Sequence, residues 1–112
     1  MAPSPSPLGE FEVIVLMAVL HLQGGAFGSA IRAEIEARSG RRAARGAVYI
    51  TLDRLEDKGL LASKLEAGTA SRGGRPRRLF RVTAAGVKAV KQSVALVARM
   101  HKGLEPLLGD LA

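Results

Sequence analysis

Two groups of arginines carry the most concentrated chemistry in this sequence. One lies between residues 38 and 45 and the other between residues 72 and 81, and neither segment contains an acidic residue. Guanidinium groups bind phosphate oxygens through paired hydrogen bonds, and the net charge of +7 favours a polyanionic partner. The pattern therefore predicts two separate contacts with nucleic acid or an anionic surface. The groups are Arg38, Arg41, Arg42 and Arg45, and Arg72, Arg75, Arg77, Arg78 and Arg81.

Other residue types exclude most catalytic and cofactor sites. The chain has no cysteine, which rules out disulfides and thiolate metal sites, and His21 and His101 lack a metal-ligand spacing. The glycine-rich residues 73–76 lack the Lys-Ser/Thr pair that a phosphate-binding loop needs. We therefore expect no enzyme activity, no cofactor and no metal. The apolar run from Val13 to Leu20 is too short to cross a membrane, and no secretory signal precedes it, which predicts a cytoplasmic protein.

The arginines need a scaffold, and three helices are predicted in the first half of the chain. Residues 1–7 alternate proline and serine, which predicts a disordered leader. Apolar residues then recur at spacings of three and four, and a glycine follows each segment. Ser29 is expected to cap the second helix. The predicted helices run from Leu8 to Gln23, from Gly28 to Ser39 and from Gly46 to Lys58.

A hairpin and a last helix are predicted in the second half. Residues 61–66 and 79–82 alternate apolar and polar side chains, which is typical of half-buried strands. Residues 68–75 between them are glycine-rich and polar, which predicts the tip of the hairpin. Thr83 is expected to cap a helix that runs to about Pro106.

One side of the last helix carries an apolar seam. Its members are separated alternately by three and four residues, the spacing with which a helix packs on a partner helix. We expect the seam to form a homodimer, because no other predicted element is long enough to cover it; packing within the chain is the alternative. His101 is expected to be a tolerated polar position rather than a pH sensor or ligand contact. The seam consists of Val87, Val90, Val94, Val97, His101, Leu104 and Leu108.

The order of elements predicts a mainly α (α+β) fold: a winged helix-turn-helix with a two-stranded wing and a long C-terminal dimerisation helix. Residues 8–83 would form the DNA-binding domain, and residues 84–112 the dimerisation helix and tail. In a helix-turn-helix the second helix of the pair enters the major groove with its N-terminal residues. The residues expected at the DNA are Arg41, Arg42, Arg45, Ala47, Tyr49, Ile50, Arg54, Arg72, Arg75 and Arg77.

Several of these positions have an alternative interpretation. Tyr49 would otherwise be a half-buried helix residue, and residues 41–45 a solvated connector. Asp53 and Asp57 lie on the same free face of the third helix and would repel phosphate. Arg54 is expected to offset them in part.

Two longer segments are specific enough to compare with a family. GAVYITLDRLEDKGLL (residues 46–61) and GGRPRRLFRVTAAG (residues 73–86) resemble the PadR family of winged-helix regulators, and the resemblance covers about residues 8–102. It implies a homodimer built through the C-terminal helix and repression of a nearby operon, with Tyr49 and the basic wing residues at the DNA. Some short members bind aromatic ligands on an aromatic side chain of the last helix. This chain has no tryptophan and no aromatic residue in that helix, so such a pocket is not carried over.

The leading hypothesis is a sequence-specific DNA-binding transcriptional regulator, a repressor that binds a palindromic operator as a homodimer. Its half-sites would lie about one helical turn apart. Residues 74–77 also resemble the core of a minor-groove hook, which would bring Arg75 close to the minor groove. The alternative is a winged-helix module for protein–protein interaction without DNA binding, against which the two acid-free arginine groups count. The residues leave open whether a small-molecule effector exists, and no membrane partner is expected.

Overall fold

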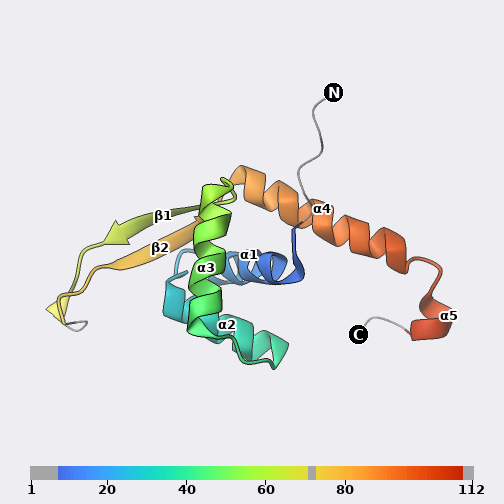
Figure 1. The fold of residues 1–112 in the computed structure, drawn as a ribbon, viewed down its shortest axis with the longest axis horizontal. Coiled ribbons are helices and arrows are strands. Elements are labelled where there is room, and N and C mark those ends of the chain that lie inside the picture. Colours follow the sequence, from blue (N-terminus) through green and yellow to red (C-terminus); the bar gives the residue numbers. More distant parts are fainter. Residues whose placement is uncertain (1–7, 71–72, 110–112) are drawn as a thin grey trace.

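Helices build the centre of the molecule, and a two-stranded sheet and a long helix project from it. The computed structural model describes residues 8–70 and 73–109, so the leader predicted at residues 1–7 lies outside the described residues. Figure 1 shows the sheet and α4 leaving opposite sides of the three-helix centre. The predicted winged helix-turn-helix is therefore confirmed. The elements are α1 (Glu10–Leu22), α2 (Gly28–Ser39), α3 (Arg45–Asp57), β1 (Leu61–Glu66), β2 (Arg77–Val82), α4 (Ala84–His101) and α5 (Glu105–Leu108).

The body, as we call α1–α3 with β1 and β2, encloses one apolar core. Each helix contributes the stripe that its spacing of three and four residues predicts, and β2 adds Phe80. Burying one such side chain stabilises the fold by about 1.5–3 kcal/mol. The largest fully buried side chains are Phe80, Leu16, Ile31, Leu52, Leu55, Leu61, Val15 and Val48.

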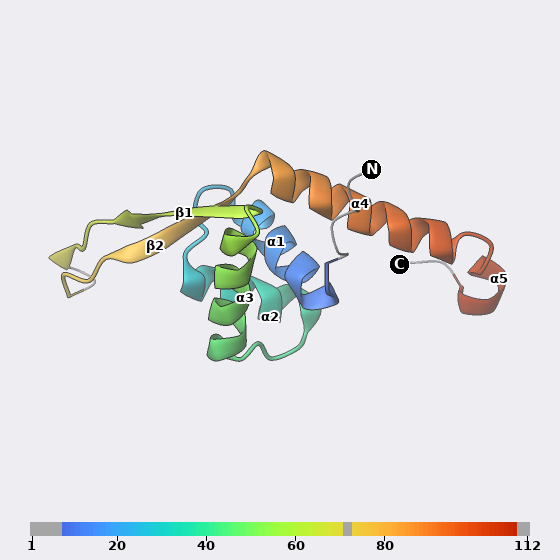
Figure 2. The ribbon, with the colours of Figure 1, turned by 45° about the horizontal axis from the view of Figure 1, so that its top comes forward.

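The wing, formed by the antiparallel pair β1–β2, is attached to the body at its base. The register pairs Leu61 with Val82 and Ser63 with Phe80. The N–H of Phe80 also donates to the carbonyl of Ala26 (2.9 Å), in the loop between α1 and α2. Figure 2 shows the far end of the wing extending away from the helices.

The start of α2 corrects one prediction. Ser29 is not the N-cap; α2 begins at Gly28, and Phe27 stands in the N-cap position without a side-chain hydrogen bond. A bridge to Leu79 holds Phe27 against the wing, in an extended backbone conformation. A tertiary contact therefore decides where this helix begins. Its end at Gly40 is as predicted, with the Gly40 N–H donating to Glu36.

The junction of α3 with the wing matches its prediction. The N–H of Leu60 donates to the carbonyl of Leu55 (2.9 Å), and the N–H of Gly59 donates to that of Glu56 (2.9 Å). These two bonds form the usual glycine-terminated end of a helix. They also return Leu60 to the core, where it is partly buried against Leu55 and its neighbours.

The junction of the wing with α4 is tight. The Thr83 hydroxyl accepts from the N–H of Gly86 (3.1 Å), as predicted, and donates to the carbonyl of Gly59 (2.7 Å). Gly86 is buried, and a Cβ on it would lie 2.2 Å from the carbonyl oxygen of Leu60. Only glycine fits this approach, so α4 rests directly on the backbone that follows α3.

The last helix is shorter than predicted. It ends at His101 rather than near Pro106. Gly103 adopts a φ of 89°, outside the helical range, and the chain then turns into the short α5. Leu104 and Leu108 therefore do not continue the seam on the same helix. We call α4 and α5 together the arm. Within the described part of the chain, no helix is both long and apolar enough to cross a membrane.

Candidate nucleic-acid interface

The outer face of α3 is the centre of the candidate site. Its inner stripe of Val48, Leu52 and Leu55 is fully buried, whereas Ile50 is 55% exposed. An aliphatic side chain this exposed on a well-packed helix does not contribute to the core. Figure 1 shows α3 lying across the outside of the body between α2 and the wing. The predicted contacts Arg45, Ala47 and Arg54 are also exposed.

The first turn of α3 favours an anion. Ala44 occupies the N-cap and provides no side-chain hydrogen bond, and the first turn has no acidic residue. The leading N–H groups of a helix lack intrahelical acceptors, and the helix dipole makes this end positive. Gly46 has no non-neighbouring atom within 4 Å of where its Cβ would lie. Backbone donors here are therefore open to a phosphate.

Two side chains of α2 fix the turn between α2 and α3. The N–H of the buried Ala43 donates to Glu36 Oε2 (2.8 Å), and its carbonyl accepts from Arg32 Nε (2.6 Å). Both polar groups of this buried residue are thereby satisfied. The sequence analysis did not identify Arg32 or Glu36, and their i, i+4 spacing on α2 is the signal that placed them together.

The basic connector lies beside this clamp. Arg41 and Arg42 are exposed, and with Arg32, Glu36 and Gly40 they line an open hollow of about 270 Å³. Arg41 Nη1 lies 3.4 Å from Glu10 Oε1, with both side chains largely exposed. Such a pair contributes little and exchanges easily for a phosphate. The connector thus presents cations next to the first turn of α3.

Tyr49 faces inward more than the DNA-contact prediction requires. It is half-buried, and a Cβ on Gly28 would lie 2.1 Å from the Tyr49 hydroxyl oxygen. The Arg45 guanidinium lies 5.5 Å from the ring centroid. Tyr49 therefore packs over the start of α2 and supports Arg45, while its proximity to DNA stays a prediction.

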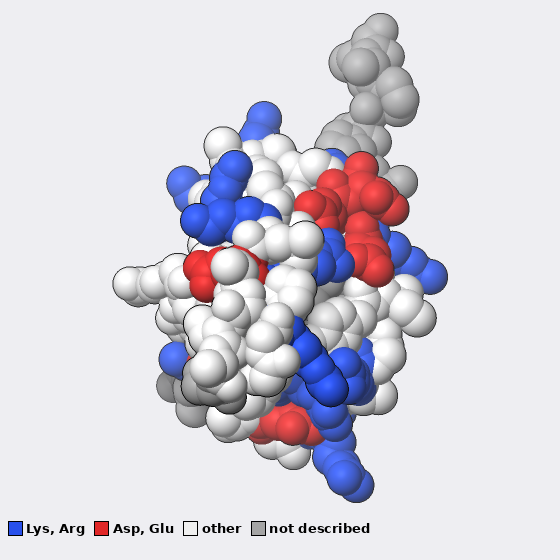
Figure 3. Space-filling model, turned by 90° about the vertical axis from the view of Figure 1, so that its left-hand side faces the viewer, with Lys and Arg blue, Asp and Glu red and all other residues white. Residues whose placement is uncertain are grey.

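The wing arginines have different environments. Arg75 is exposed near the tip, whereas the guanidinium of Arg77 lies 3.4 Å from the ring centroid of Phe27. Cation–π contacts of this kind hold a side chain in place. Arg72, also predicted at the DNA, lies outside the described residues. Figure 3, which views the molecule from the wing end, shows Lys and Arg side chains on either side of an uncharged projection, with Asp and Glu in separate patches.

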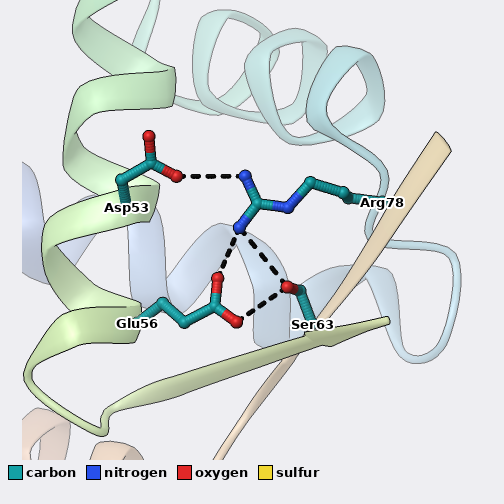
Figure 4. A network of polar contacts seen from close by, with 4 residues as sticks. All are labelled: Asp53, Glu56, Ser63 and Arg78. Carbon is teal, nitrogen blue, oxygen red and sulfur yellow. Dashed lines mark hydrogen bonds and ion pairs between the residues drawn. The ribbon is translucent and has the colours of Figure 1, made fainter. Parts of the chain in front are cut away.

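Arg78 joins the wing to α3, a role the sequence analysis missed. Its Nη1 donates to Asp53 Oδ1 (3.0 Å), and its Nη2 forms an ion pair with Glu56 and contacts Ser63 Oγ (3.3 Å). Ser63 in turn donates to Glu56 Oε2 (2.8 Å), which closes the network in Figure 4. The hydrogen bond with Asp53 is the main cause of the raised pKa of Arg78. Asp53 is therefore neutralised by Arg78 and not, as expected, by Arg54.

The arm presents a second surface. Of the predicted seam, Val90 is buried and Val87 half-buried against the body, so the first turns belong to the core. His101 is largely covered; its Nδ1 lies 3.8 Å from Glu105 Oε1, and its buried Nε2 has no hydrogen-bond partner among the described residues. The exposed apolar side chains of the arm are Val94, Leu96, Val97, Met100, Leu104, Leu107 and Leu108.

Known proteins share this arrangement. Residues 16–92 match the family model described as the transcriptional regulator PadR-like family. The chain is 26% identical to a PadR family regulator from Eggerthella lenta, with a TM-score of 0.68 over 91% of this chain and 88% of that one. A PadR-like transcription factor from Bacteroides fragilis is 21% identical, with a TM-score of 0.72 over 87% and 88%. A PadR family regulator from Clostridium difficile is also 21% identical, with a TM-score of 0.69 over 88% and 99%. No match was found among curated protein sequences.

Proposed function

This chain belongs to the PadR-like family of transcriptional regulators, and from that premise we propose that it represses transcription by binding a palindromic operator as a homodimer. The family match confirms the resemblance and the expectation of a DNA-binding regulator rather than an enzyme. The homodimer, the palindrome and the repression are the proposal.

The observation that carries the proposal is the exposed first half of α3. Arg45, Ala47 and Ile50 face away from the core, at the helix end where backbone N–H groups are open. In winged helix-turn-helix proteins this is the part of the second helix that reaches base edges in the major groove. Ile50 would supply an apolar contact and Arg45 a hydrogen-bonding one.

Phosphate contacts would come from both sides of α3. Arg41 and Arg42 lie at its N-terminal end, and the wing with Arg75 begins beyond its C-terminal end. Phosphate contacts position a protein on DNA, whereas base contacts give it specificity. Arg75 near the wing tip would lie in or beside the minor groove.

The arm would bring two copies together. Its exposed side chains, including Val94, Val97 and Met100, form an apolar surface that a monomer would leave in water. A second copy packed on this surface would place two α3 helices on one face of the DNA, and the two-fold symmetry of the dimer would be mirrored in the operator.

The test is a gel-shift titration on DNA from the region upstream of the protein's own gene, with unrelated DNA as competitor. We expect a discrete complex that resists competitor. With about 6–10 phosphate contacts per dimer, raising salt from about 50 to about 200 mM should weaken binding by about 10³–10⁵. Absence of any complex at low salt would overturn the proposal and favour a protein-interaction module.

A matched pair of variants refines this experiment. Arg42→Ala removes an exposed cation beside α3, and it should weaken binding to all sequences and reduce the salt slope by about 0.9. Lys102→Ala removes an exposed cation at the end of α4 and should leave affinity unchanged. Equal effects of the two substitutions would mean that general positive charge, rather than the α3 face, governs binding.

A further inference from the structure

Resting on the proposed DNA binding, we propose that Arg78 is a positioning residue: it holds the wing at a fixed angle to α3 through Asp53 and Glu56 and does not contact DNA itself. The idea begins from its donors. Both terminal nitrogens of the guanidinium are directed at acceptors within the protein, namely Asp53, Glu56 and Ser63. A phosphate would have to displace these contacts.

The geometry of the network suits a strut between two elements. Asp53 and Glu56 are three residues apart, so their side chains lie on the same side of α3. Arg78 reaches both from β2, and Ser63 of β1 bonds to both Arg78 and Glu56 (Figure 4). Both strands of the wing are thereby tied to one side of the helix expected in the major groove.

The neighbouring arginine holds the opposite face of the same strand. Successive side chains of a strand point to opposite faces, and Arg77 lies on the ring of Phe27, in the loop before α2. Arg78 itself also lies 4.7 Å from the ring centroid of Phe80. Two consecutive arginines therefore fix the start of β2 from both sides, one to α3 and one to the α1–α2 loop.

Charge alone predicts a different outcome from positioning, and this separates the two. Glu56 is a negative charge near the proposed DNA surface, so removing it should tighten binding if only Coulomb attraction to phosphate matters. If Glu56 instead anchors Arg78, removing it should release the wing and weaken binding. The two readings thus differ in sign.

The experiment measures affinity for the upstream DNA fragment with Glu56→Gln and Asp57→Asn, two variants of α3 with the same change in charge. Asp57 is exposed and lies outside the network. We expect Glu56→Gln to weaken binding about tenfold and Asp57→Asn to leave it unchanged or slightly tighter. Glu56→Gln binding as tightly as Asp57→Asn would overturn the proposal.

Arg78→Lys supplies the second comparison. It keeps the positive charge but cannot bridge two carboxylates in a fixed geometry, so we expect a similar tenfold loss with an unchanged salt slope. A direct phosphate contact by Arg78 predicts instead that Arg78→Ala reduces the slope by about 0.9, as for Arg42→Ala. That reduction in Arg78→Ala would also overturn the proposal.

Amide hydrogen exchange of the free protein judges the positioning without DNA. In Glu56→Gln and Arg78→Lys we expect faster exchange in β1 and β2 and unchanged exchange in α1–α3. Unchanged exchange in the wing would contradict the strut even if the wild-type protein bound no DNA. Failure of the proposed function and failure of this inference are therefore observed separately.

Discussion

Apolar side chains of the body point into a closed core, whereas those of the outer arm point into solvent. Leu52 in α3 is fully buried, and Val97 in α4 is 65% exposed. Both residues belong to helices whose apolar positions recur at three and four. The same pattern thus serves two purposes: in the body its partner is elsewhere on the same chain, and in the arm its partner is a surface that the chain does not supply.

This difference divides stability from assembly. The body contains the helix-turn-helix and encloses its own core, so its folding depends on contacts within one chain. The arm adds Val90 to that core near its start and then extends beyond it. Changes in the body should therefore alter the free energy of unfolding, and changes in the outer arm should alter oligomeric state.

The largest effect is expected for Leu52→Ala in the body. Truncating a fully buried leucine leaves a cavity and lowers the free energy of unfolding by about 3–5 kcal/mol. Urea denaturation followed by circular dichroism measures this loss. The matched control is Leu65→Ala on the wing, where the side chain is 69% exposed and the change should stay within about 0.5 kcal/mol. Similar losses in both variants would contradict the closed core of the body.

The next effect is expected for Val97→Lys in the arm. A charge introduced into both copies at an apolar contact should raise the dissociation constant of the dimer by about a hundredfold, or about 2.8 kcal/mol. Sedimentation velocity measures the shift to monomer, and circular dichroism should show the helices retained. Gln92→Lys adds the same charge at another exposed position of α4 and should leave the dimer intact. A Val97→Lys protein that remains dimeric would place the interface elsewhere.

A smaller effect is expected where the two regions join. In Gly86→Ala the new Cβ would meet the Leu60 carbonyl oxygen at 2.2 Å, so backbone must shift, at a cost of about 1–3 kcal/mol. The same substitution at Gly46, a helical glycine in open space, should be neutral or stabilising by up to about 1 kcal/mol. Thermal unfolding of both variants tests this, and equal midpoints would mean that the junction is not rigid.

The smallest effect is expected within the body, at the ion pair between α1 and α3. Burial raises the pKa of Glu12, but hydrogen bonds from Lys58 Nζ (2.6 Å) and the Gly9 N–H (3.0 Å) outweigh it and lower the pKa below 4.5. The carboxylate therefore stabilises the fold at neutral pH, and this contribution disappears as the pH falls through the lowered pKa.

Unfolding of Glu12→Gln at two pH values measures that contribution. At pH about 7 the variant should be less stable than the wild type by about 0.5–1.5 kcal/mol, and the gap should close near pH 2, where Glu12 is protonated in both folded and unfolded chains. Glu10→Gln, at a largely exposed pair with Arg41, should show almost no gap. A gap for Glu12→Gln that persists at low pH would assign its cause to packing.

Local signals in the sequence predict most of the body. The bounds of α2 and β1 agree with the predicted ranges, because glycines and a clear apolar period mark them. Two misses have tertiary or backbone causes. The bridge between Phe27 and Leu79 places the start of α2 where Ser29 cannot cap it, and the conformation of Gly103 ends α4 early.

The candidate site is less predictable, because its organisation depends on contacts between distant residues. The exposure of Arg42 and Ile50 follows from helix period and connector position. The pairing of Asp53 with Arg78 joins residues 25 apart, and only the side of α3 that β2 covers reveals it. Similarly, the sequence marks Arg77 as a cation, whereas its place over Phe27 requires the folded loop.

The Thr83–Gly86 junction turns the arm into a lever. The Thr83 hydroxyl bonds to Gly59, Gly86 rests on Leu60, and both contacts lie on the backbone that leaves α3. The 18 residues of α4 span about 27 Å at 1.5 Å each. Because the joint is stiff, tilting one arm against its twin by about 10° would displace the far end by about 5 Å. A small adjustment at the arms would thus change the reach between two recognition helices, and operator spacing would be set by the angle at which two levers cross.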